Sequence, residues 1–219
     1  MSFAVWLENR TPFAVGSYAV PDADGQEVFL GLFSASFAGV DETSPLEPAE
    51  DQVPVTLGDV FFGDPSCSST RYEADIAAVK PGVDVIVNGT AHAPNGKPVR
   101  EMQAGVKFGL LQKVLNVVGD RIYDAGSYSA PHPFTRMPIV YERACGGTTA
   151  DQKTDPRNPL GVGFAHARSA DPAVRTQAPN ITYPAEPFTS PSDKPRPAGF
   201  GALGRGWQPR LPLAGTYVQ

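Results

Sequence analysis

The sequence predicts a mainly β protein with little helix. We expect an antiparallel body, either sandwich-like or a twisted sheet, with an extended Pro- and Gly-rich C-terminal segment packed on it. The first observation is composition: 23 prolines and 22 glycines in 219 residues favour short strands and turns over long helices. The second is that apolar residues in the first 145 positions alternate with a period of two. The third is that aromatic residues recur through the proline-dense end, which a disordered tail would lack.

The first strands are expected near the N-terminus. Residues 3–7 (FAVWL) and 13–18 (FAVGSY) are separated by ENRTP, a plausible turn. In residues 27–37 (EVFLGLFSASF), Phe29 and Phe33 share one parity, as they would on one face of a strand.

The next strands follow the same logic. Residues 83–92 (VDVIVNGTAH) place valines at alternate positions, and residues 93–98 (APNGKP) supply a turn. The stretches 99–111 and 113–118 can then return as strands. A helix is harder to place. The best short candidates are 46–52 and 73–79, and neither reaches three turns.

The chain changes character at about residue 151. Prolines become dense, and proline cannot donate to a central sheet ladder. Phe164, Phe188 and Trp207 nevertheless recur there, so the end of the chain is expected to be ordered. We therefore expect one domain, with a β-rich body over 1–150 and a wrapping segment over 151–219.

Composition also restricts location and partners. The net charge of −5 argues against nucleic-acid binding, which needs concentrated Lys and Arg. No apolar run approaches the roughly 18 residues of a spanning helix, and the N-terminus lacks the basic and apolar regions of a secretory signal. The two cysteines form no CxxC motif and are expected to be free thiols. These features predict a cytoplasmic protein without membrane insertion.

No motif commits the chain to catalysis. The glycine-rich stretch 197–217 lacks the Lys-Ser or Lys-Thr of a phosphate-binding loop and is interrupted by prolines. His92, His132 and His166 show no metal-ligand spacing. Cys145 precedes two glycines, but a small buried side chain beside a turn explains it better than a nucleophile. We expect no catalytic residues, no metal and no cofactor.

Five segments in order carry a resemblance to a known family. They are SSTRYEADIAAVKPGVDVIVNGTAHAP (68–94), MPIVYERACGG (137–147), NPLGVGF (158–164), APNITYP (178–184) and GWQPRLPLAGTY (206–217). Together they resemble the bacterial family known as domain of unknown function 2169, whose members are linked to type VI secretion systems. The resemblance implies an adaptor or chaperone, not an enzyme. Such a protein would bind a toxin effector, often one with a PAAR-like domain, and help load it onto the VgrG spike.

The resemblance transfers motif positions but no catalytic roles. The motif positions expected to be structural are Tyr141, Arg143, Gly146, Gly147, Asn158, Gly161 and Tyr217. Trp207, Arg205 and Arg210 combine an aromatic ring with two guanidinium groups, the residue types enriched at binding hot spots, and are the partner-binding candidates. The alternative is that Trp207 anchors the wrapping segment and Arg210 pairs with an acidic residue such as Asp120.

Two departures and two other function classes stay open. Family members usually continue beyond the AGTY motif, whereas this chain stops at Gln219, so a further C-terminal part is an open question. The position before the double glycine is often aromatic but here is Cys145. The other classes are a metal-assisted hydrolase using the three histidines and a carbohydrate-binding β module using Tyr72 or Trp6.

Overall fold

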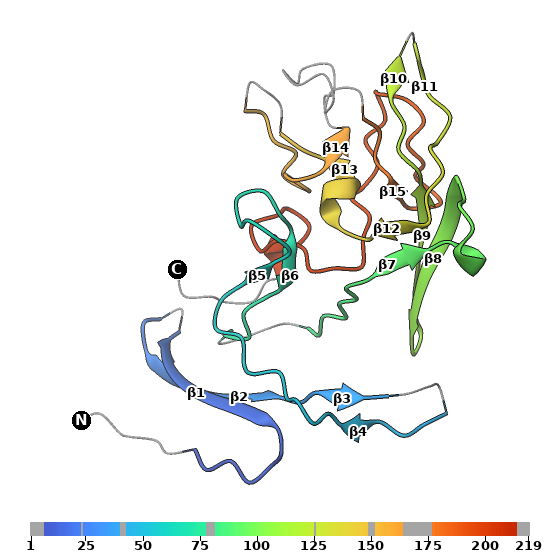
Figure 1. Cartoon of the computed structure of the whole chain (residues 1–219). Helices are drawn as coiled ribbons and strands as arrows, with labels where there is room; N and C mark the ends of the chain where they lie inside the picture. The colour runs from blue at the N-terminus through green and yellow to red at the C-terminus, as the bar shows by residue number, and fades with distance from the viewer. Residues whose placement is uncertain are drawn as a thin grey trace. The chain divides into compact units, whose positions relative to one another are not determined.

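The computed structural model describes residues 7–22, 24–39, 43–77, 82–124, 126–148, 152–163 and 177–213. The predicted mainly β class with little helix is confirmed: the strands form several small, mostly antiparallel sheets, and the described helices are short 3-10 turns (Figure 1). In chain order the elements are β1 (Ala14–Pro21), β2 (Glu27–Ser34), β3 (Phe37–Ala38), β4 (Glu47–Pro48), β5 (Val60–Phe61), β6 (Thr70–Tyr72), β7 (Thr90–His92), η1 (Pro94–Gly96), β8 (Glu101–Phe108), β9 (Leu111–Val118), β10 (Tyr123–Asp124), β11 (Ser127–Tyr128), β12 (Arg136–Pro138), η2 (Tyr141–Arg143), β13 (Cys145–Gly146), β14 (Val162–Gly163), β15 (Ile181–Thr182) and η4 (Leu211–Leu213).

The chain divides into two compact units. Unit 1 takes residues 1–60, 72–83 and 213–219, and unit 2 takes residues 61–71 and 84–212. Most of the segment expected to wrap thus belongs to the same unit as β8 and β9. The single-domain expectation stays a prediction.

Unit 1 is built on the β1–β2 hairpin. All eight residues of each strand pair, from Ala14↔Ser34 to Pro21↔Glu27. The Phe13 ring packs against the rings of Phe33 and Phe37, with centroids 5.3 and 5.6 Å away. The paired strands confirm the alternation read from residues 13–18 and 27–37.

The expected short helices are wrong wherever the structure describes them. Residues 47–48 form β4, which pairs antiparallel with β3. Residues 73–77 form no helix, and 78–79 lie outside the described residues.

Unit 2 is organised around the β8–β9 hairpin. Its register runs from Glu101↔Val118 to Phe108↔Leu111, so the turn is Gly109-Leu110, earlier than the alternation suggested. Gly109 has φ +56°, which a type II′ turn requires at its first central position and glycine adopts without strain.

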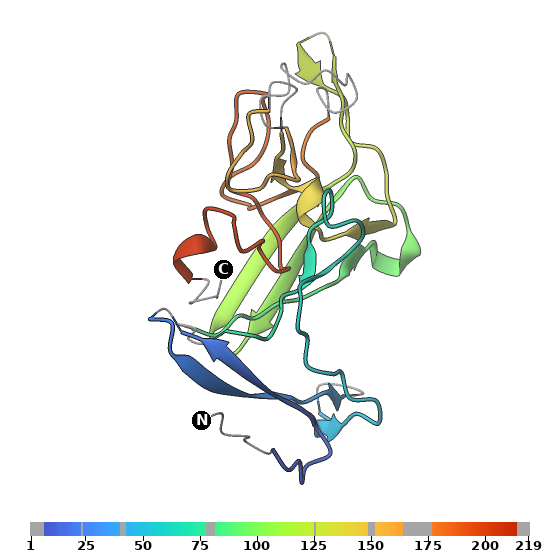
Figure 2. The same ribbon diagram turned by 90° about the vertical axis from the view of Figure 1, so that its left-hand side faces the viewer.

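The core of unit 2 forms at the base of this hairpin. Leu115 and Val117 of β9 are fully buried, and β15 pairs with β9 at Val117 and Asn116. The C-terminal segment contributes Ile181 and Ala198 to the same cluster, both fully buried. Figures 1 and 2 show this orange-to-red segment running beside the green hairpin. The expectation that the Pro-rich segment packs on strands of the body is confirmed.

Candidate functional site

Family-motif residues meet around the side chain of Asn158. Asn158 is fully buried, and its Nδ2 donates to the carbonyl oxygens of Tyr141 (2.8 Å) and Cys145 (3.1 Å). The backbone carbonyl oxygen of Asn158 accepts from the backbone N–H of Gly147 at 2.8 Å. A single amide therefore links η2, β13 and the loop before β14. We call this set, with Gly146 and Gly161, the Asn158 hub.

The glycines of the hub leave no room for side chains. Gly146 has φ +149°, and a Cβ added there would lie 2.1 Å from the carbonyl oxygen of Asn158. A Cβ on Gly161 would lie 2.5 Å from the carbonyl oxygen of Ala144. Because these obstacles are backbone atoms, they cannot rotate away. The spacing of the double glycine and the later Gly161 is thus a packing requirement.

Arg143 stabilises the neighbouring chain segments. Its Nη1 donates to Asn180 Oδ1 at 3.1 Å and lies 3.5 Å from Asp120 Oδ1. Asn180 Nδ2 in turn donates to Asp120 Oδ1 at 2.9 Å. Asp120, which the sequence suggested as a partner of Arg210, is therefore a partner of Arg143.

Two of the three partner-binding candidates make contacts that fix the C-terminal segment. The half-buried Trp207 ring meets Tyr141 edge-on, with centroids 5.4 Å apart. Arg210 is 5% exposed and donates from Nη2 to Asp84 Oδ2 at 2.9 Å. Arg205 is half-buried. These contacts support a structural role for Trp207 and Arg210, while their role in partner binding stays a prediction. Tyr217 lies outside the described residues.

The Cys145 thiol lies in a closed apolar pocket. It clusters with Ala178 and Phe188, and Tyr128 packs against them. Burial raises the pKa of the Cys145 thiol to about 12, so the side chain is protonated at neutral pH. A protonated, inaccessible thiol is a poor nucleophile. The geometry thus supports the reading of Cys145 as a small buried side chain.

Residues of the two alternative functions are dispersed. His92 and His132 are exposed, and the parts of the chain that the structure describes contain no group of three His, Cys, Asp or Glu side chains able to hold a metal. His166 and Trp6 lie outside those parts. Tyr72 is exposed.

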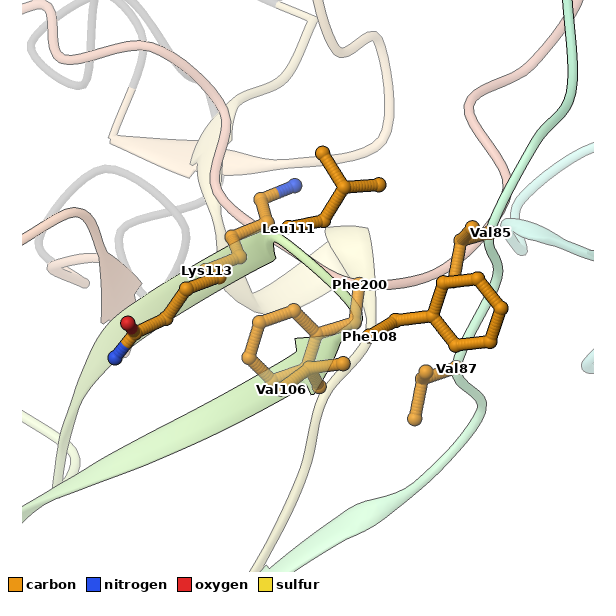
Figure 3. Close-up of a pocket in the computed structure, with 8 residues that line it drawn as sticks. Val85, Val87, Val106, Phe108, Leu111, Lys113 and Phe200 are labelled. Atoms are coloured by element: carbon orange, nitrogen blue, oxygen red, sulfur yellow. The ribbon is translucent and has the colours of Figure 1, made fainter.

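The feature that sequence reasoning missed is an open apolar groove at the tip of the β8–β9 hairpin. Its volume is about 250 Å³. The residues that line it are Val85, Val87, Val106, Phe108, Leu111, Gln112, Lys113 and Phe200. In Figure 3 the Phe108 ring reaches toward Val85 and Val87, which come from the segment before β7. We call this the tip groove.

The tip groove continues the face that forms the core. Residues opposite each other in an antiparallel pair share a face, so Val106, Phe108, Leu111 and Lys113 lie on the same face as Leu115. At the tip this face is open: Phe108 and Leu111 are 64% and 63% exposed, and Leu110 in the turn is fully exposed. Exposed large apolar side chains gathered at one place mark an interaction site.

The far wall of the tip groove is held in place by the backbone. The N–H of Val87 donates to the carbonyl oxygen of Phe200 at 2.9 Å. Small-molecule and cofactor pockets occupy roughly 300–1,000 Å³. The smaller tip groove suits one large apolar side chain of a partner better than a cofactor. The sequence signal for it was the run Phe108–Gly109–Leu110–Leu111, four non-polar residues at a turn.

The fold and these features define a small, mainly β protein with an exposed apolar groove at the end of one hairpin. A family model matches residues 24–219, so the chain belongs to the uncharacterized proteins conserved in bacteria known as domain of unknown function 2169 (DUF2169). No curated protein and no solved structure matches the chain. Within the described residues, no helix combines the length and apolar character needed to cross a membrane.

Proposed function

We propose that this protein is an adaptor or chaperone of a type VI secretion system. It binds a toxin effector in the cytoplasm, often one bearing a PAAR-like domain, and helps load it onto the VgrG spike. It acts by binding and not by catalysis. The observation that carries the proposal is the tip groove, an exposed apolar surface on a member of an uncharacterized family whose resemblance implies an adaptor.

The physical support is the contrast between surface and core. When a partner covers an exposed apolar cluster, the burial stabilises the complex by about 25 cal/mol per Å² of apolar area removed from water. The β-rich fold adds strand edges, on which an extended partner segment can form backbone hydrogen bonds.

The non-catalytic part of the proposal draws on the motif residues. The Asn158 Nδ2 group donates to two backbone carbonyl oxygens, and Gly146, Gly147 and Gly161 are required by close backbone packing. Cys145 is buried and protonated. The family-motif residues that the structure describes thus have structural roles that explain their presence without catalysis.

Co-expression tests the proposal. The tagged chain is co-expressed with the product of each neighbouring gene, and the purified material is resolved by size-exclusion chromatography. We expect one neighbour, a toxin effector, to elute with the tagged chain and to be less soluble when expressed alone. If no neighbouring gene product is retained, the proposal is wrong.

A further inference from the structure

Strand β8 has one side that faces away from β9. Two residues connect the strands, so Phe108 and Leu111 form the hydrogen-bonded pair that closes the turn. Hydrogen-bonded pairs alternate along an antiparallel ladder. The N–H and C=O groups of Gln103, Gly105 and Lys107 therefore point away from β9.

This side of β8 is an open edge in the part of the chain that the structure describes. The sheet order is β15-β9-β8, which leaves β8 at the end of the sheet. No backbone hydrogen bond joins Gln103, Gly105 or Lys107 to a segment on that side. All three residues are exposed, and Gly105 has no side chain to shield the edge. An open edge of this length is a template for another strand.

Two lysines lie on the half of the hairpin that carries the tip groove, although the chain carries a net charge of −5. Lys113 lines the groove with its Nζ 5.5 Å from the centre of the Tyr183 ring. Lys107 lies on the open edge, and its side chain is on the opposite face of the sheet because it alternates with Val106 and Phe108. Within the described residues neither ammonium group meets a carboxylate. Asp84, near the groove in sequence, is engaged by Arg210.

We propose that an extended acidic segment of the effector adds to the β8 edge as a fourth strand, with one apolar side chain in the tip groove. The inference rests on the proposed function only for the identity of the partner. Backbone groups of Gln103, Gly105 and Lys107 supply the ladder. Val106, Phe108 and Phe200 receive the apolar side chain. The residues that flank it in the added strand point to the opposite face, where Lys107 attracts their carboxylates, and Lys113 attracts carboxylates on the groove face.

An anionic membrane would also attract an apolar tip flanked by lysines. A membrane surface makes no use of an open strand edge or of a groove closed on its far side by Val85 and Val87. The combination of edge, groove and lysines favours a peptide strand. Lysines also protect edges against unwanted pairing, but that role leaves the groove unexplained.

Hydrogen exchange with a defined probe tests the proposal directly. The probe is a capped nine-residue peptide with a central Phe. A Glu stands on each side of the Phe, and Glu and Val alternate from there to both ends. The control peptide carries Lys in place of Glu. Exchange is followed by NMR on the isotope-labelled whole chain. With saturating acidic peptide, we expect the amides of Gln103, Gly105 and Lys107 to exchange about tenfold more slowly. The amides of Ala104 and Val106 already face β9 and serve as internal controls.

Two variants sharpen the test. Gly105→Pro removes only an outward donor, at an edge position where proline is tolerated, and should abolish the protection without unfolding the sheet. Lys107→Glu should lower the affinity for the acidic peptide about tenfold and allow the basic peptide to bind. Lys97→Glu, an exposed lysine in the loop after η1, makes the same change of net charge elsewhere and should alter neither.

The outcomes separate the two proposals. Strand addition is wrong if the three outward amides stay unprotected at saturating peptide, or if both peptides protect them equally. It is also wrong if the chain binds phosphatidylserine vesicles through Leu110 and not the peptide. If the effector is still retained by Gly105→Pro and Lys107→Glu, the adaptor function stands and the docking site is elsewhere. If no neighbour is retained by the unaltered chain, the function fails, while the exchange data still decide the edge.

Discussion

The two halves of the β8–β9 hairpin present the same face in opposite states. At the base, Leu115 and Val117 are fully buried under β15 and residues of the C-terminal segment. At the tip, Phe108 and Leu111 continue the face and are more than half exposed. The side chains are equally apolar in both halves, so the difference lies in which other segments reach them. The tip is therefore an apolar face that the described residues of its own unit leave largely exposed.

The largest expected effect contrasts two leucines of one strand. Leu115→Ala removes a fully buried side chain and should lower the free energy of unfolding by about 2–5 kcal/mol. Leu111→Ala, four residues earlier on the same face, is the matched control. Urea unfolding monitored by tryptophan fluorescence measures both. Equal losses for the two variants would show that the tip is as closed as the base.

Trp207→Ala tests a second closed contact. The ring packs edge-on against Tyr141 and helps to hold the C-terminal segment, so its loss should cost about 1–3 kcal/mol. That corresponds to a melting temperature lower by several degrees, which differential scanning calorimetry detects. An unchanged melting temperature together with loss of effector binding would instead make Trp207 an interface residue.

The closed thiol pocket predicts a fall in stability at high pH. Burial raises the pKa of Cys145 to about 12, whereas the unfolded thiol titrates near 9. Between about pH 9 and 12 the unfolded state loses this proton and the folded state keeps it, so stability falls as pH rises. Burial raises the pKa of Tyr128 to about 12 as well, which adds a fall of the same sign above pH 10.

Variants of the two cysteines separate the contribution of Cys145 from that of Tyr128 to the fall in stability at high pH. Cys145→Ala should make the decline of the urea midpoint above pH 9 shallower. Cys67→Ala, at an exposed cysteine, should leave the slope as it is. A slope that is the same in both variants would mean that the Cys145 pocket opens to solvent.

The fold class followed from the sequence because alternation and turn residues act locally. The segments expected as strands at 13–18, 27–37, 99–111 and 113–118 coincide with the two long hairpins, although the second turn falls at residues 109–110 and not at 112. Alternation could not predict that Leu111 is exposed and Leu115 buried. Burial depends on where β15 and the C-terminal segment return, which no local pattern specifies. The same limit applies to pairing: Arg210 was expected near an acid such as Asp120, and Asp84, 126 positions away along the chain, is the residue it meets.

The motif residues show the converse. The double glycine and Asn158 were expected to be structural from the resemblance alone. The structure supplies the reason, which is the approach of a backbone oxygen to within 2.1 Å of a Cβ position at Gly146. That requirement is three-dimensional and cannot be worked out from spacing.

The smallest expected effect on stability belongs to the tip. Leu111→Ala should change the free energy of unfolding by no more than about 0.5 kcal/mol, because the side chain is already largely in water. Effector retention in the co-expression assay should nevertheless drop. A loss of stability comparable to that of Leu115→Ala would contradict the description of the tip as open.

If a partner binds at the open end of the hairpin, Leu111→Asp should prevent binding without unfolding the chain. The variant is co-expressed with the effector that the unaltered chain retains, and its melting temperature is measured in parallel. We predict an unchanged melting temperature and loss of the effector, because a carboxylate cannot enter an apolar contact. Retention of the effector by a folded Leu111→Asp chain would contradict binding at the open end.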